Sequence, residues 1–209
     1  MKVYISVDIE GVAGITHWDE AQKNHPDYAE FREQMTREAV AAIEGAEAAG
    51  ATEIWVKDAH DSGRNLITSM LPANIRLIRS WAGHPLCMVQ ELDKSFDAVM
   101  MVGYHAAAGS EANALAHTLS LKPHLIRLNG RAASEFYIHA LAGSLNGVPT
   151  VFVTGDEGLM AEVKSTNAAI GRCAVKRGIG QSPASLTPKA AVTAIRSAWC
   201  RSSIRASTR

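Results

Sequence analysis

MKVYISVDIEGVAG, residues 1–14, is the stretch of sequence that decides the fold. Residues 2–8 form a β-branched and aromatic run that ends in the carboxylate of Asp8, which is typical of a buried strand that opens into a loop. We therefore expect Asp8 at the C-terminal edge of a strand, with Glu10 farther along the loop. Because these two carboxylates interrupt the apolar stretch, it does not fit the core of a signal peptide.

The segment that follows has the period of an amphipathic helix. Apolar or small residues recur every three or four positions between residues 27 and 49, with charges between them: Tyr28, Phe31, Met35, Ala39, Ala42, Ala46 and Ala49. Gly50 is well placed to end this helix. The chain thus begins with a strand, a loop rich in carboxylates and a helix.

Later apolar runs repeat this alternation. Strands are expected at residues 53–58, 75–80, 97–103 and 147–156, and a helix-like stretch follows at 157–165. Between them lie an Asn-Gly turn at 129–130 and a helix that Ser134 could cap, with Glu135 in its first turn. Strands separated by helices predict an α/β fold, a doubly wound and mainly parallel sheet in a three-layer arrangement.

Composition and charge narrow the class of protein. The chain has 209 residues, of which 47% are hydrophobic, and its 21 basic residues balance 21 acidic ones. No positive field would attract nucleic acid or an anionic membrane, and no run approaches the roughly 20 apolar residues of a membrane span. The three cysteines form no close pair, which favours a reducing compartment, the cytoplasm. We expect one domain over residues 1–198 and a basic, disordered tail over 199–209.

Three polar residues stand at or just beyond the ends of expected strands, namely Asp8, His60 and His105. In a doubly wound sheet the loops after parallel strands meet at one edge, where ligands bind. Glu10 can reach the same space, and one more carboxylate, Glu135, would complete a set for two divalent ions that share a bridging oxygen. Each residue alone also fits an ordinary loop cap or surface group, so the prediction rests on the set.

The residues around these positions resemble a known family. The stretches SVDIEGVAG, KDAHDSGRN, GYHA, LNGRAASEFYIHALAGSLNGVP and VTGDEGLMAEVKS, with His117 between the third and fourth, resemble the D-aminopeptidase family of the bacterial dipeptide-transport operon. The match runs in order over most of residues 1–176. It implies a cytoplasmic zinc aminopeptidase that removes N-terminal D-amino acids, such as D-alanine, from short peptides.

The resemblance also implies roles for individual residues. Metal ligands would be Asp8, Glu10, His60, His105 and Glu135, with Asp8 bridging two zinc ions per chain, and His117 would be a catalytic residue that binds no metal. The family further implies a homo-oligomer, with a decamer as the candidate size. The ring nitrogen of each histidine that does not bind metal needs an acceptor, and three aspartates could supply one or simply form turns: Asp58, Asp61 and Asp156. Two further residues could orient the His60 loop or contact substrate, Arg64 and Asn65.

Two other functions fit parts of the sequence. A magnesium phosphatase of the haloacid dehalogenase type also carries two carboxylates after its first strand, but its chemistry leaves the two strand-end histidines unexplained. A metal-binding assembly protein with impaired catalysis is the second alternative, because members of the resembling family continue for some tens of residues beyond the position of residue 209. Turnover of a D-aminoacyl amide separates the enzyme from the assembly protein.

Overall fold

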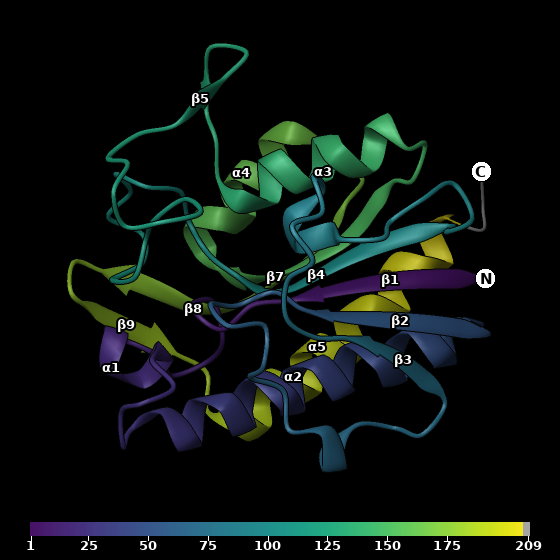
Figure 1. Ribbon diagram of the computed structural model, residues 1–209, viewed down its shortest axis with the longest axis horizontal. Helices are drawn as coiled ribbons and strands as arrows, with labels where there is room; N and C mark the ends of the chain where they lie inside the picture. Colours follow the sequence, from purple (N-terminus) through teal and green to yellow (C-terminus); the bar gives the residue numbers. More distant parts are fainter. Residues whose placement is uncertain (207–209) are drawn as a thin grey trace.

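The structure is a computed structural model that describes the backbone of residues 1–206 and the side chains of residues 1–199. Its centre is a seven-stranded sheet in the order β3-β2-β1-β4-β7-β8-β9 (Figure 1). The strands have these bounds: β1 Lys2–Val7, β2 Glu53–Asp58, β3 Ile75–Ile78, β4 Ala98–Tyr104, β7 Thr150–Asp156, β8 Gly171–Ile179 and β9 Ser182–Ser185. A separate hairpin projects from the body, made of β5 Arg127–Leu128 and β6 Arg131–Ala132.

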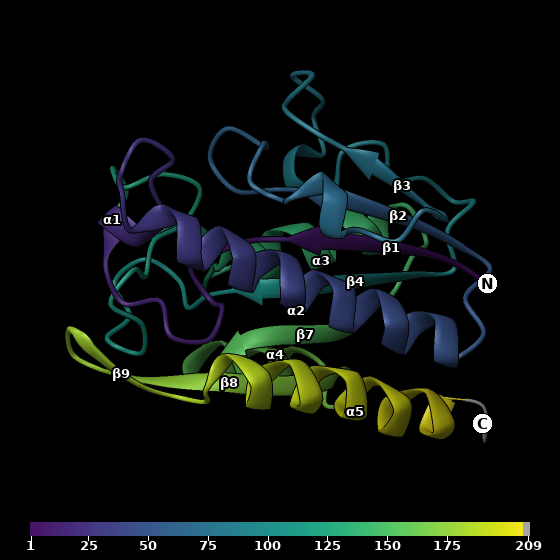
Figure 2. The same cartoon turned by 90° about the horizontal axis from the view of Figure 1, so that it is seen from below.

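Helices cover both faces of this sheet. They are α1 Trp18–Ala21, α2 Tyr28–Ala48, α3 Glu135–Leu145, α4 Glu157–Thr166 and α5 Pro188–Ala206, with short 3₁₀ turns at Thr68–Met70 and Cys87–Val89. The long helices α2 and α5 run side by side along one face, while α3 and α4 lie on the other (Figures 1 and 2). The predicted three-layer α/β fold is therefore confirmed. None of the helices in the described part of the chain is long and apolar enough to cross a membrane.

The central position of β1 follows from its side chains. Val3, Ile5 and Val7 contribute to the core under α2 and α5, whereas Tyr4 contributes to the core on the opposite face. A strand that is apolar on both faces is stable only when helices cover it on both sides, as in parallel α/β sheets. β1 pairs in parallel with β2 and with β4, and only β9 at the edge is antiparallel.

Two glycines let the loop after β1 lie against the end of β4. A Cβ on Gly11 would stand 1.7 Å from the Tyr104 carbonyl oxygen, and one on Gly103 would stand 2.3 Å from the Asp8 carbonyl oxygen. Gly103 also has a φ of +69°, in the left-handed region that favours glycine. The backbone bond from Gly11 N–H to the Gly103 carbonyl, 2.8 Å long, closes this contact. It fixes the carboxylate-bearing loop beside the strand that leads to His105.

The element positions agree with most of the expectations. The helix predicted from the 27–49 pattern is α2, the strand predicted at 53–58 is β2, and Ser134 caps α3 by accepting from the Tyr137 amide. The Asn-Gly turn joins β5 and β6, with positive φ at both residues. Helix α5 continues to Ala206, past the expected domain boundary at 198, and Trp199 packs edge-on against Phe152. Residues 207–209 of the expected tail lie outside the described residues.

Glu38 is a buried carboxyl group under the loop that follows β1. Its Oε1 accepts hydrogen bonds from the Ala13 amide at 2.9 Å and from Gln34 Nε2 at 2.8 Å. Its Oε2 is buried without a hydrogen-bond partner among the described residues. Burial therefore raises the pKa of Glu38 to about 7.

This pKa predicts a specific pH dependence of stability. Between pH 4.5 and 7 the folded protein holds a proton on Glu38 that the unfolded chain releases, so the free energy of unfolding falls as pH rises through this window. The loss is about 3 kcal/mol. In urea unfolding at pH 5 and pH 8, the unsubstituted protein should lose more stability than Glu38→Gln, and the difference between the two proteins is the contribution of Glu38. Glu30→Gln, an exposed position on the same helix, is the control; identical pH profiles for all three proteins would contradict the prediction.

Candidate metal centre

The predicted ligands meet in one cavity at the C-terminal edge of the sheet. It has a volume of about 590 Å³, and Asp8, Glu10, His60, His117 and Glu135 line it. The aromatic side chains of Trp18 and Trp81 form parts of its wall, together with Met88, Leu119 and Leu121. His105 is completely buried behind this lining. Four separate parts of the chain thus meet at this edge, among them the strand ends at Asp8 and His60 that the sequence pattern predicted to converge.

Asp8 lies between two histidines from different strand ends. Its Oδ1 is 3.4 Å from His60 Nδ1, and its Oδ2 is 3.6 Å from His105 Nε2. Glu10 Oε1 approaches the same nitrogen of His60 at 3.1 Å, while Glu135 Oε2 approaches His105 Nε2 at 3.3 Å. The five side chains therefore form two sets that share one carboxylate.

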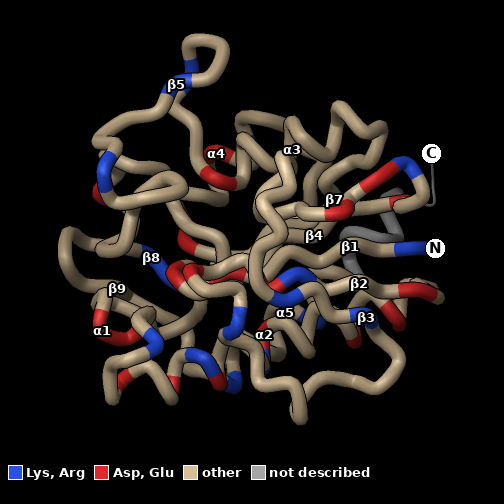
Figure 3. The backbone as a smooth tube through the Cα atoms, viewed as in Figure 1, with Lys and Arg blue, Asp and Glu red and all other residues tan. Residues whose placement is uncertain are grey.

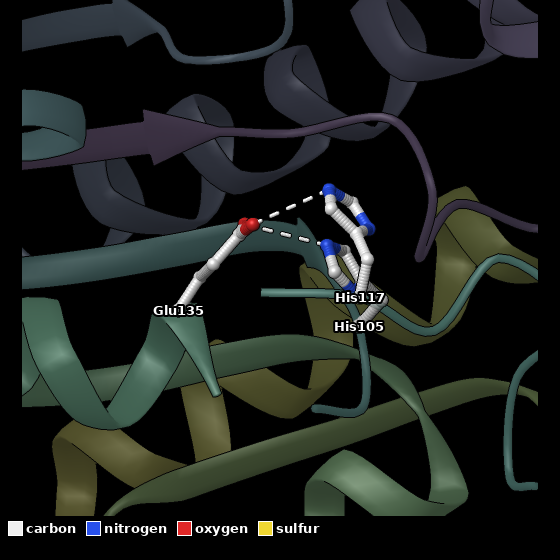
Figure 4. A group of neighbouring side chains, drawn as sticks. All are labelled: His105, His117 and Glu135. Atoms are coloured by element: carbon white, nitrogen blue, oxygen red, sulfur yellow. Dashed lines mark ion pairs between the residues drawn. The ribbon is translucent and has the colours of Figure 1, made fainter. Parts of the chain in front are cut away.

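His117 lies beside the second set. Its ring stacks on that of His105, with centroids 4.3 Å apart and an interplanar angle of 10°, and its Nε2 is 3.4 Å from Glu135 Oε1 (Figure 4). Trp18 contacts the His117 ring edge-on, with ring centroids 5.3 Å apart. Unlike His105, His117 is partly exposed to the cavity, with 14% of its side chain accessible. It can reach both the ligand cluster and a molecule bound in the cavity.

Backbone carbonyls fix the tautomer of all three histidines. His60 Nε2 donates to the Ala21 carbonyl at 2.9 Å, His105 Nδ1 to the Ala106 carbonyl at 3.0 Å, and His117 Nδ1 to the Leu115 carbonyl at 3.0 Å. Because a carbonyl only accepts, the proton is on the nitrogen that faces away from the cluster. The other nitrogen of each ring faces the carboxylates, and in the neutral ring its lone pair is free to bind a metal ion.

Asp58 and Asp156, two of the three aspartates that could accept from these rings, bind the loops instead. Asp58 accepts from the backbone amides of Asn65 and Leu66 and from the Asn65 side chain. The side-chain nitrogen of Asn65 also donates to the His60 carbonyl at 2.6 Å, and its side-chain oxygen accepts from the Tyr28 hydroxyl at 2.7 Å. Asn65 is buried and orients the His60 loop, whereas Arg64 is exposed.

Two further groups hold the other loops in place, Asp156, which the sequence offered as an acceptor or turn former, and Lys176, which no sequence motif indicated. Asp156, which also caps α4, accepts from the Ala106 amide at 2.8 Å and so fixes the residue after His105. The buried Lys176 ammonium donates to the carbonyls of Glu10 at 2.6 Å and Ile15 at 2.9 Å. The role of Lys176 is recognisable only once the chain is folded, because Lys176 is remote in sequence from the loop that it supports.

The charges of the cluster are unbalanced without a cation. Burial and the neighbouring Glu10 carboxylate raise the pKa of Asp8 well above its ordinary value. For His105, burial alone would lower the pKa, but the Glu135 carboxylate outweighs it and raises the pKa to about 10. Burial, together with the charge of His105, lowers the pKa of His117. Three buried carboxylates and two imidazoles thus compete for protons in a very small volume.

The donor set fits divalent metal ions. The ligand atoms of Asp8, Glu10 and His105 lie within 4.8 Å of one another, and so do those of His105, His117 and Glu135. Within the described residues, Glu10 Oε2 and His105 Nε2 are buried atoms without a hydrogen-bond partner. A metal ion would satisfy both atoms and neutralise the carboxylates, and mixed nitrogen and oxygen ligands suit zinc and related ions.

Comparison with known proteins agrees with this geometry. A family model described as D-aminopeptidase (peptidase M55) matches residues 1–208. This chain belongs to the D-aminopeptidase family. Membership decides against a phosphatase of the haloacid dehalogenase type, whose magnesium chemistry also leaves the buried histidines without a role.

The sequence comparison and the structural comparison of this D-aminopeptidase family member both match a D-aminopeptidase from Bacillus subtilis. The D-aminopeptidase of strain 168 is 32% identical over 185 residues, a match that covers 87% of this chain and 66% of the relative. The solved structure of "Zn-dependent D-aminopeptidase DppA from Bacillus subtilis, a self-compartmentalizing protease" superposes with a TM-score of 0.94 at 27% identity. That match covers 99% of this chain and 75% of the solved one, so the whole described fold has a counterpart.

Proposed function

We propose that this family member is a zinc-dependent aminopeptidase that removes N-terminal D-amino acids, such as D-alanine, from short peptides. The observation that carries the proposal is the buried carboxylate of Asp8 between His60 and His105, with Glu10 and Glu135 completing two ligand sets at the bottom of a cavity. Zinc is proposed because the solved relative is described as zinc-dependent. The cavity is large enough for a short peptide.

Two ions per chain follow from the shared carboxylate. Asp8, Glu10 and His60 would hold one ion, and Asp8, His105 and Glu135 the other. Zinc in such a site lowers the pKa of water and polarises a carbonyl group. The described side chains would contribute to catalysis in two other ways. The buried cluster limits access of bulk water, and the cavity wall positions the peptide.

His117 is proposed as the group that moves a proton. Its Nδ1 is held by the Leu115 carbonyl, so its Nε2 faces the cavity near Glu135. Burial keeps the imidazole neutral at neutral pH because it lowers the pKa. A neutral imidazole at this position can accept a proton from the attacking water or pass one to the leaving amine.

We also propose a homo-oligomer in the cytoplasm, with the decamer as the size to test. The solved relative is described as self-compartmentalizing, which requires several chains to enclose a space. In this chain the segment between β4 and β5 exposes Leu119, Leu121 and Leu125 at 50%, 64% and 45%. Clustered exposed leucines are typical of an interaction surface. Light scattering at micromolar concentration would determine the number of chains.

The test of the activity is hydrolysis of D-alanine p-nitroanilide and its L isomer by purified protein. Zinc content is measured on the same sample before and after chelation. We expect chelator-sensitive cleavage of the D isomer, with close to two zinc ions per chain. Bound zinc without cleavage of either isomer would instead support a metal-binding assembly protein, and absence of metal would overturn the ligand assignment.

A further inference from the structure

One basic side chain stands among the residues that line the cavity. Of these residues, Lys23 alone is a lysine or arginine, and it is exposed in the short segment between α1 and α2. Asp61, from the loop after β2, is the exposed acidic residue of the lining. Elsewhere acidic and basic positions are mixed along the backbone (Figure 3). The cavity lining therefore includes one exposed basic and one exposed acidic side chain.

The position of Lys23 is coupled to the ligand cluster. Ala21, two residues earlier, accepts through its carbonyl the hydrogen bond of His60 Nε2 at 2.9 Å. The short helix before it is fixed by a capping box in which His17 accepts from the Asp19 amide and Glu20 accepts from the His17 amide. The backbone that carries Lys23 is thus tied to the same wall as His60.

The ammonium group of Lys23 is available to a ligand. Among the ion pairs found within the described residues, none includes Lys23. The neighbouring Gln22 and Asn24 also line the cavity and are exposed, so amide donors flank the ammonium. This combination of a cation and neutral donors suits a carboxylate.

A short peptide offers such a carboxylate. If the bond next to the N-terminal residue is cut at the ligand cluster, the C-terminal carboxylate of a dipeptide or tripeptide lies only about 4 to 8 Å away, at roughly 3.5 Å per residue. The side chain of Lys23, which lines the same cavity, is suited to meet it. We propose that Lys23 binds the C-terminal carboxylate of the substrate and makes the enzyme prefer short peptides with a free C-terminus. This inference rests on the proposed aminopeptidase function.

The expected preference for the free acid follows from the solvent exposure of the ion pair between Lys23 and the substrate carboxylate. An ion pair with an exposed lysine is a weak interaction, so the preference for the free acid should be about two- to fivefold. It should appear in KM and not in kcat, since Lys23 does not touch the reacting bond. It should also shrink in 0.5 M salt, where screening shortens the range of the charge to a few ångströms.

The experiment compares D-alanyl-D-alanine with its C-terminal amide as substrates of the zinc-loaded protein. The measured quantity is the ratio of kcat/KM for the acid to that for the amide. We expect Lys23→Gln to lower this ratio about two- to fivefold through a higher KM for the acid, and Lys23→Arg to retain most of it. Lys164→Gln, which removes the same charge from an exposed position on α4 outside the cavity, should leave the ratio unchanged.

Other outcomes separate this inference from the function on which it rests. An unchanged ratio in Lys23→Gln, with both substrates still cleaved, overturns the role of Lys23 and leaves the aminopeptidase proposal standing. An equal loss for acid and amide also overturns it, because it would show a structural role for the segment. Failure of the unsubstituted protein to cleave either substrate overturns both proposals together.

Discussion

Asp8→Asn is expected to empty both halves of the metal centre and to lower turnover of D-alanine p-nitroanilide on the order of a thousandfold, a barrier increase of ~4 kcal/mol. Asp8 is the carboxylate within 3.6 Å of both His60 and His105, so each ligand set loses its shared member. Asparagine keeps the shape but supplies a neutral ligand, to which zinc binds more weakly. Zinc content should fall from about two ions per chain to well below one.

Substitution of residues that belong to only one of the two ligand sets makes this prediction specific. Glu10→Gln affects only the set at His60, and Glu135→Gln only the set at His105, so each should lose about one ion. Asp27→Asn, which changes an exposed aspartate at the start of α2, is the matched control and should keep both ions and full turnover. Full zinc content in Asp8→Asn would show that Asp8 is not shared.

The sequence was sufficient to predict the strands and helices that carry the proposed ligands. Asp8, His60 and His105 each follow an apolar run of strand length, and parallel pairing alone brings the ends of such strands to one edge. Glu135 could be placed because Ser134 marks the start of α3. Periodicity and capping are local properties, so they are visible in the sequence before any contact is known.

Contacts between remote residues could not be predicted in this way. Nothing in the sequence indicates that Lys176 supports the Glu10 loop, or that the carbonyl of Ala21 accepts from His60. Strands β8 and β9, at one end of the sheet, carry small and charged residues with little alternation, and their pairing is fixed by the folded sheet. The sequence suggested aspartates as acceptors for the histidine nitrogens that face away from the cluster. The acceptors are backbone carbonyls, which every residue possesses, so no residue type marks them.

His117→Gln is expected to keep both zinc ions and to lower kcat by roughly 10²- to 10⁴-fold, the usual contribution of general acid–base catalysis. The reason is the difference between two stacked rings. His105 is fully buried and its Nε2 is close to two carboxylates, as a ligand requires, whereas His117 is partly exposed to the cavity and faces Glu135 alone. Glutamine can still fill the space but cannot transfer a proton at neutral pH.

The stacking geometry also defines how this prediction can fail. The ligand atoms of His117, His105 and Glu135 lie within 4.8 Å of one another, so His117 is close enough to bind metal itself. Loss of one zinc ion in His117→Gln would make it a ligand, and unchanged kcat would leave it without a role in proton transfer. His124→Gln, an exposed histidine in the same segment that does not line the cavity, is the control. Zinc retained together with a large loss of kcat is the result that separates a proton-transfer group from a ligand, because only a ligand must be present for the metal to stay.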